Sequence, residues 1–174
     1  MINFDEKGLS GMKVLMVDDT PTNLDILGHI MKMGGLSLSV APNGETALKI
    51  ISRDKPDLIL LDVMMPGING FEVCEKLKED DNTKDIPVIF ITAKVETDDI
   101  VRGFDVGGVD YIIKPFNEKE VLARVGTQLS LRKMAKEKEA LIKELDSLSR
   151  IDSLTKLSNR RDIFEKLEYE QAKF

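Results

Sequence analysis

At positions 58–66 the sequence is Leu58-Ile59-Leu60-Leu61-Asp62-Val63-Met64-Met65-Pro66. A continuous run of aliphatic residues that ends at a polar residue is typical of a strand buried on both faces of a parallel sheet. Further short apolar runs lie before and after it in the chain, at 14–17, 36–40, 88–91 and 109–113. We therefore expect five strands, with the strands at 58–61 and 88–91 in the centre of the sheet.

Segments with helical periodicity alternate with these runs, at about 21–34, 44–54, 69–79, 94–107 and from 117 onward. Thr20 before Pro21 is typical of a helix start, and Asn69 can cap the third helix. Alternating strands and helices predict an α/β fold, a doubly wound parallel sheet with right-handed crossovers and helices on both faces. The strict apolar-polar alternation of Leu36–Val40 predicts that the second strand lies at an edge.

The composition predicts a globular protein of one domain and a fraction. The chain has 174 residues, 42% of them apolar and 32% charged. No apolar run approaches the roughly 18 residues of a membrane span, the start of the chain has no signal-peptide pattern, and Cys74 is the single cysteine. We therefore expect a cytoplasmic location and no membrane contact. Residues 1–116 have 12 basic against 20 acidic residues, so we expect no DNA binding by this chain.

Polar side chains follow four of the five apolar runs. The first run ends in Asp18 and Asp19, the third in Asp62, the fourth in Thr92 and the fifth in Lys114. In an open parallel sheet, ligands bind outside the carboxyl ends of the strands, so we expect these side chains to converge there.

Three carboxylates in one crevice repel each other unless a proton or a cation is bound. An all-oxygen ligand set with room for water suits Mg²⁺, and a carboxylate can also accept a phosphoryl group. Cys74 and His29 are single residues in predicted helices, away from the strand ends, so we expect no site for a softer metal.

Four motifs occur in order, each at the end of a predicted strand: Val17-Asp18-Asp19, then Leu60 to Pro66 followed by Gly70, then Ile91-Thr92-Ala93, then Tyr111-Ile112-Ile113-Lys114-Pro115-Phe116. Through these motifs, residues 12–128 resemble the response-regulator receiver family. The resemblance implies a flavodoxin-like sheet with strand order 2-1-3-4-5. It also implies a two-component phosphorelay, in which a sensor histidine kinase or a phosphotransfer protein is the partner that donates the phosphoryl group. Residues 1–11 are then expected to be an N-terminal tail.

The same resemblance implies roles for the polar residues at the strand ends. Asp62 is the expected phosphoacceptor. Asp19 and Asp62 are expected to ligate Mg²⁺ together with the backbone carbonyl of Met64, whereas Asp18 acts through a metal-bound water. Lys114 is expected to pair with the phosphoryl group, and its peptide bond to Pro115 is expected to be cis.

A switch is also implied, in which the Thr92 hydroxyl moves to the phosphoryl group and the Tyr111 ring turns inward behind it. Tyr111 as an ordinary surface aromatic is the alternative. Ala93 is small enough to leave the phosphoryl path open, and Met64 with Lys94 is expected to tune water access. The alternative for Met64 is loop packing without a function.

The last predicted helix continues past residue 128. Residues 129–150 have apolar residues at three-four spacing, interrupted by one lysine, which is typical of a coiled-coil seam in a homodimer. The seam residues are Leu131, Met134, Lys138, Leu141, Leu145 and Leu148. A single helix that folds back on the receiver is the alternative.

Residues 152–161, Asp-Ser-Leu-Thr-Lys-Leu-Ser-Asn-Arg-Arg, resemble the opening of GGDEF domains, the diguanylate cyclases. Lys156 departs from this pattern, because many members have glycine there. We expect residues 151–174 to be the N-terminal fragment of such a domain. No GGDEF loop occurs up to Phe174, so we expect no enzyme activity from this chain itself and a cyclase output in its full-length parent.

Two other functions remain open from the sequence. An aspartate-nucleophile phosphatase also uses carboxylates and Mg²⁺ on an α/β sheet, but it needs one residue between its two aspartates, and Asp18 and Asp19 are adjacent. A phosphorylation-independent dimerisation module is the other. Turnover of small phosphate esters would favour the phosphatase, and dimerisation that is indifferent to Asp62 would favour the module.

Overall fold

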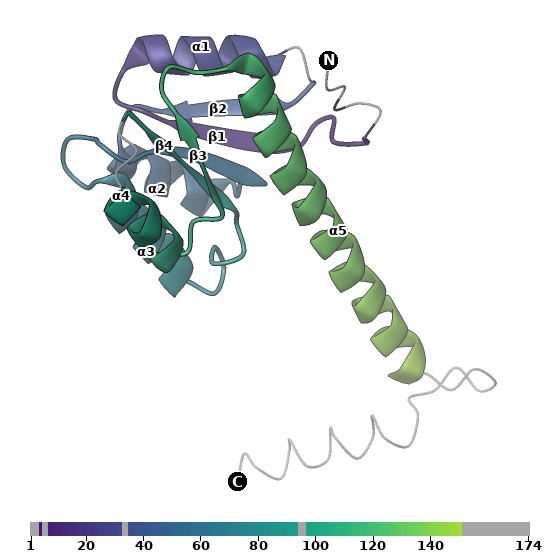
Figure 1. Cartoon of the computed structure of the whole chain (residues 1–174). Helices are drawn as coiled ribbons and strands as arrows, with labels where there is room; N and C mark the ends of the chain where they lie inside the picture. Colours follow the sequence, from purple (N-terminus) through teal and green to yellow (C-terminus); the bar gives the residue numbers. More distant parts are fainter. Residues whose placement is uncertain (1–3, 5–6, 33–34, 94–96, 151–174) are drawn as a thin grey trace, which may run out of the picture. The chain divides into compact units, whose positions relative to one another are not determined.

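The computed structural model describes residues 4, 7–32, 35–93 and 97–150. Strands and helices alternate along this part of the chain (Figure 1). The strands are β1 (Lys13–Val17), β2 (Ser37–Ala41), β3 (Leu58–Asp62), β4 (Val88–Thr92) and β5 (Asp110–Ile113). The helices are α1 (Pro21–Lys32), α2 (Gly44–Arg53), α3 (Gly70–Glu79), α4 (Thr97–Asp105) and α5 (Glu118–Arg150).

The five strands form one parallel sheet in the order β2-β1-β3-β4-β5, as the family resemblance implied. β2 is an edge strand, and most of its residues are exposed or half-buried, which confirms the prediction from its alternating pattern. β3 and β4 are buried along their whole length. Because β1 pairs with β3, the carboxyl ends of these two strands lie next to each other.

Two apolar clusters cover the two faces of the sheet. One contains Val14 and Met16 with residues of α1 and α5, and the other contains Leu15 and Val17 with residues of α2 and α3. Successive residues of β1 alternate between the two clusters, because side chains along a strand point to opposite faces. The sheet is therefore buried on both sides, which accounts for the continuous apolar runs of its central strands.

Asparagine side chains fix the starts of two helices. The Asn69 side chain accepts a 3.0 Å hydrogen bond from the Glu72 amide, and the Glu72 carboxylate accepts one of 2.8 Å from the Asn69 amide. This capping box confirms the prediction for Asn69. Asn43 caps α2 in a similar way through the Thr46 amide.

The segment before β1 contributes to the core, although we expected a tail there. Phe4 and Leu9 are completely buried, in the same cluster as Met31 of α1 and Leu129 of α5. The Leu9 amide donates a 2.8 Å hydrogen bond to the Phe4 carbonyl. The expectation of a tail came from the extent of the family resemblance, which begins at residue 12, and a segment this short buries its apolar residues without any periodic pattern.

The chain divides into two compact units, residues 1–133 and 134–174, and the sheet belongs to the first. No helix in the described ranges is long and apolar enough to cross a membrane. The fragment at 151–174 that resembles a GGDEF domain lies outside the described residues.

Candidate functional site

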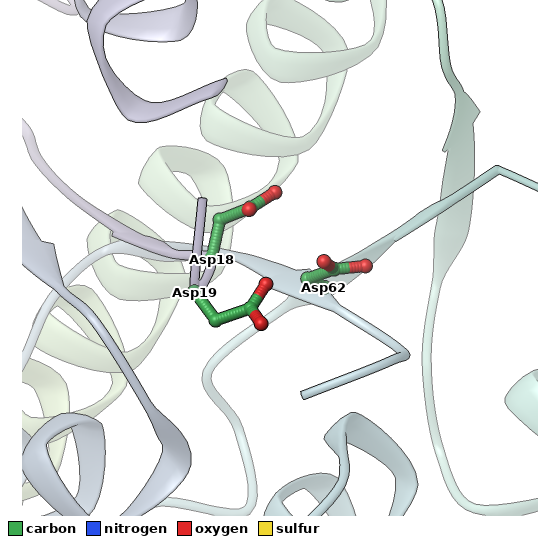
Figure 2. Close-up of side chains that lie close together, drawn as sticks. All are labelled: Asp18, Asp19 and Asp62. Carbon is green, nitrogen blue, oxygen red and sulfur yellow. The ribbon is translucent and has the colours of Figure 1, made fainter. Parts of the chain in front are cut away.

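Three carboxylates lie together where β1 and β3 end. Asp18 and Asp19 follow β1, and Asp62 is the last residue of β3. One carboxylate oxygen of each of Asp18, Asp19 and Asp62 lies within 4.8 Å of the other two. Figure 2 shows the Asp19 carboxylate extending towards Asp62. The convergence follows from the strand order, because a parallel sheet places the ends of β1 and β3 side by side.

Asp18 is completely buried and fully engaged by the protein. One of its oxygens accepts hydrogen bonds from the Thr20 amide and the Asn23 side-chain amide, both at 2.9 Å. Its other oxygen accepts from Asn23 at 3.0 Å and lies 2.8 Å from Nζ of Lys114. A carboxylate held in this way is oriented by its neighbours, which leaves Asp19 and Asp62 better placed for direct contact with a ligand.

Lys114 joins two of the three carboxylates. Its Nζ lies 2.8 Å from Asp18 and 2.9 Å from Asp62, and its side chain is mostly buried. Burial by itself would lower the pKa of Lys114, but its hydrogen bonds and its attraction to Asp18 and Asp62 prevail, so the pKa is raised. The lysine is therefore charged at neutral pH. Its amide also donates a 2.8 Å hydrogen bond to the Thr92 carbonyl, and the Lys114–Pro115 bond is cis, as predicted.

Asp62 is more deeply buried than an ordinary carboxylate. Burial raises its pKa above the ordinary value, and the nearby Asp18 charge acts in the same direction. The hydrogen bond and charge of Lys114 lower the pKa but do not cancel the effect of burial. Lys114 contacts Oδ2 of Asp62, and the Met64 amide lies 3.4 Å from its Oδ1.

The side chains present fit a hard divalent cation. The three carboxylates and Lys114 sum to a charge of −2, which one divalent ion would neutralise. Asp19 is exposed, and the hydrogen bond that it accepts from the Thr20 hydroxyl is long, at 3.3 Å. Oxygen ligands that are few and partly open to water suit Mg²⁺. His29 is exposed on α1 and Cys74 is buried on α3, so neither takes part in this group.

Comparison with known proteins identifies the family. A family model described as the response regulator receiver domain matches residues 14–126. The chain belongs to the response regulator receiver family. It is 39% identical over 117 residues to the DNA-binding response regulator MtrA of Mycolicibacterium smegmatis, covering 67% of this chain and 50% of MtrA. It is 43% identical over 113 residues to the response regulator PleD of Caulobacter vibrioides, covering 65% of this chain and 25% of PleD.

Solved receiver structures have the same fold. A putative response regulator from Chloroflexus aurantiacus superposes with a TM-score of 0.67 at 32% identity, covering 70% of this chain and 99% of that one. The chain is therefore a receiver domain of a two-component system with a flavodoxin-like sheet. It spans about half the length of MtrA and a quarter of the length of PleD.

The two residues predicted to form the receiver's switch lie on neighbouring strands. Thr92 is the last residue of β4 and is buried, and Tyr111 is on β5 and half-buried. Both line a partly open cavity, with Phe71, Phe90 and Phe104 among its other walls. The structure thus brings the pair to one cavity, and their switching role stays a prediction.

Two of the residues expected to control water access, Met64 and Ala93, follow the ends of β3 and β4. Met64 is 77% exposed, so most of its surface is open to solvent. Ala93 directly follows β4 and is exposed. Lys94 lies outside the described residues, and the effect of Met64 and Ala93 on access stays a prediction.

Two residues that hold the site were missed in the sequence. Thr20, directly before α1, and Asn23, in the first turn of α1, bind the Asp18 carboxylate. The sequence does contain one signal for Asn23. It is an amide side chain in the first turn of a helix that begins just after the aspartates at the end of β1. Arg124 was also missed, because it is on α5 and contacts Tyr111 only through the packing of that helix against β5.

Proposed function

We propose that this receiver accepts a phosphoryl group on Asp62 in a Mg²⁺-dependent reaction, with a sensor histidine kinase or a phosphotransfer protein as its donor. The observation that carries the proposal is the environment of Asp62 at the end of the central strand β3. Its carboxylate lies 2.9 Å from the Lys114 ammonium and belongs to the group of three carboxylates. Asp18 lies deeper and Asp19 is not bonded to the lysine in this arrangement, so Asp62 is the best placed acceptor.

The residues have separate tasks in this reaction. Asp19, Asp62 and the Met64 carbonyl would hold Mg²⁺ directly, and Asp18, already bonded to Asn23 and Lys114, would act through water. The bound ion supplies positive charge that offsets the charge developing on the phosphoryl oxygens. An oxygen of ionised Asp62 attacks phosphorus, and the bond from phosphorus to the donor breaks. Lys114 compensates the remaining charge as a point cation.

Incubation with acetyl phosphate and Mg²⁺ tests the acceptor assignment. The intact mass is expected to rise by one phosphoryl group, and Asp62→Asn is expected to abolish this rise because an amide cannot act as the nucleophile. Asp57→Asn is the matched control, since Asp57 is a buried aspartate that accepts a hydrogen bond from the Lys13 amide at the opposite end of β1. Equal labelling of Asp62→Asn and the parent would contradict the proposal, and continuous release of phosphate from esters would favour the phosphatase.

We propose further that phosphorylation changes the surface formed by α4, β5 and α5, and that a homodimer formed through α5 carries the change to a diguanylate cyclase output. Support comes from the heptad spacing of the seam and from the resemblance of residues 152–161 to the start of a GGDEF domain. A cyclase joins two GTP molecules, so control by a dimer is economical. The name of MtrA as a DNA-binding regulator supports an alternative output.

The full-length protein distinguishes the two outputs. With GTP, Mg²⁺ and acetyl phosphate it is expected to form cyclic dinucleotide, and its Asp62→Asn variant is expected to form much less. Retention of duplex DNA by the phosphorylated protein, with no cyclic dinucleotide formed, would favour the DNA-binding output instead.

A further inference from the structure

Arg124 of α5 is fixed beside the edge strand β5 by two carboxylates. Its Nη1 lies 2.5 Å from the Asp110 carboxylate of β5, and its Nε donates a 2.9 Å hydrogen bond to Glu120, one turn earlier in α5. The pKa of Arg124 is raised, with the hydrogen bond to Asp110 as the largest cause, so the guanidinium is always charged. Its position is therefore defined by β5 and α5 together.

The guanidinium lies over the ring of Tyr111. Its central carbon is 5.3 Å from the ring centroid, within the range of a cation–π interaction. The Phe104 ring of α4 contacts the same tyrosine edge-on, at 6.4 Å between centroids and 78° between planes. Tyr111 therefore has stabilising contacts with both helices that flank it.

These contacts concern the position of Tyr111 seen in this structure. The ring also borders the cavity that Thr92 lines, and in the function proposed above it turns inward when Asp62 is phosphorylated. Any such movement takes the ring away from the guanidinium, while Arg124 stays bonded to Asp110 and Glu120. The interaction with Arg124 is thus available to one ring position and is lost in the other.

We propose that Arg124 is a positioning residue. It holds Tyr111 in the position seen in this structure, here called the outer position, and so sets how readily the receiver switches. The inward movement of the Tyr111 ring rests on the proposed function. The contact between Arg124 and Tyr111 seen here does not depend on that function. Loss of a partly exposed cation–π contact is expected to change the ratio of the two ring positions about threefold. Because Arg124 belongs to α5, the same contact links the switch to the helix that carries the dimer seam.

Tyrosine fluorescence provides a direct test. The chain has two tyrosines and no tryptophan, so Tyr169→Phe leaves Tyr111 as the single fluorophore. In this background we would measure emission and acrylamide quenching while adding beryllofluoride with Mg²⁺ as a mimic of the phosphoryl group. Arg124→Ala is expected to move the midpoint of the response to an about threefold lower beryllofluoride concentration, and to change Tyr111 quenching before any mimic is added.

Two further variants separate positioning from general loosening. Arg124→Lys keeps a cation near Asp110 without the planar guanidinium, so we expect a smaller shift than with alanine. Arg102→Ala is the matched control, since the Arg102 guanidinium lies 4.6 Å from the centroid of the Phe71 ring, whereas the cation over Tyr111 is Arg124. It is expected to leave the midpoint unchanged, and circular dichroism would check that each variant is folded.

Each outcome decides the inference. An unchanged midpoint in Arg124→Ala, or an equal shift in Arg102→Ala, would overturn it. If the parent shows no response to beryllofluoride, the proposed function fails, and Arg124 is then judged by the quenching measured without the mimic. Unchanged quenching in Arg124→Ala under that condition would also overturn the positioning role.

Discussion

At the scale of single residues, burial changes the chemistry of Cys74 more than any neighbouring charge does. The thiol is completely buried on α3 and lies 3.4 Å from the Val106 carbonyl, to which it donates a weak hydrogen bond. Burial raises the pKa of Cys74 to about 11, while the Lys78 charge acts in the opposite direction. The residue is therefore an unreactive apolar side chain at neutral pH.

The raised pKa of Cys74 predicts a loss of stability in alkali. The folded protein keeps the thiol proton up to a pH of about 11, whereas the unfolded chain loses it near 9.0, so stability falls as pH rises between these values. A shift of this size corresponds to about 2–3 kcal/mol. The difference in unfolding free energy between the parent and Cys74→Ala is expected to shrink between pH 8 and pH 10.5 in denaturant titrations. An equal difference at both pH values would contradict this assignment.

Gly70 shows a different constraint at the residue scale. A Cβ at this position would collide with the backbone carbonyl of Asp62 and lie 3.0 Å from the Cα of Val63. The start of α3 therefore packs directly against the backbone of the proposed phosphoacceptor. A side chain at residue 70 would displace α3 or the end of β3. Steric exclusion therefore explains why this position of the motif is glycine.

At the scale of elements, the segment before β1 packs as part of the receiver although it lies outside the part matched by the family model, which begins at residue 14. Besides the buried Phe4 and Leu9, the Gly11 amide donates a 2.9 Å hydrogen bond to the Gly35 carbonyl. A Cβ at Gly8 would lie 2.6 Å from Nζ of Lys133. The segment therefore contacts both Gly35, between α1 and β2, and the part of α5 within the first unit.

Removing either buried side chain of this segment is expected to destabilise the domain. Leu9→Ala should lower the unfolding free energy by about 2–5 kcal/mol and Phe4→Ala by about 3–5 kcal/mol, as at other core positions. Lys7→Ala is the control in the same segment, because Lys7 is exposed. Denaturant titration measures all three, and losses near zero for Leu9 and Phe4 would mean that the segment does not pack against the core.

Helix α5 changes character along its length. Its first half buries Val121, Val125 and Leu129 against the sheet. Beyond Leu129, apolar side chains of the helix are half or more exposed, namely Leu131, Met134, Leu141, Ile142 and Leu145. Leu148 belongs to the predicted seam, but its side chain lies outside the described residues. Exposed apolar residues at heptad spacing favour a second helix as their partner, and the dimer stays a prediction.

At the scale of the whole molecule, the proposed signal is a change in association between two chains. Phosphorylation adds charge at a site that Lys114 compensates, and a coupling of about 1–3 kcal/mol would change a dimer population about 5- to 150-fold. Such coupling needs a physical link between the switch residues and the predicted seam. Helix α5 contains both Arg124, which contacts Tyr111, and the seam residues.

Sedimentation with and without beryllofluoride and Mg²⁺ would measure this coupling. The mimic is expected to strengthen the dimer. Leu141→Lys combined with Leu145→Lys is expected to weaken it in both states, because like charges would meet in the seam. Lys143→Ala is the control, since Lys143 is exposed on the same helix and pairs with Glu139. Equal association of all samples would contradict α5 as the output element and favour the fold-back alternative.

The sequence by itself determined the strand and helix order, the edge position of β2 and the set of polar residues at the strand ends. These features depend on local patterns, since burial on both faces makes a strand continuously apolar and a parallel sheet gathers the residues that follow its strands. The pairing order of the strands came from the family resemblance, because periodicity does not define which strands are neighbours. The sequence pattern and the family resemblance together therefore group the motif residues into one site.

Only the tertiary structure decided how each of these residues is engaged. Whether Lys114 contacts one carboxylate or two depends on distances between three strand ends, and the burial of Asp18 depends on Asn23 reaching it from α1. The positions of Phe4 and Leu9 in the core, and of Arg124 over Tyr111, also join residues far apart in the chain. Such contacts have no sequence period, because they arise from how helices and loops pack against the finished sheet.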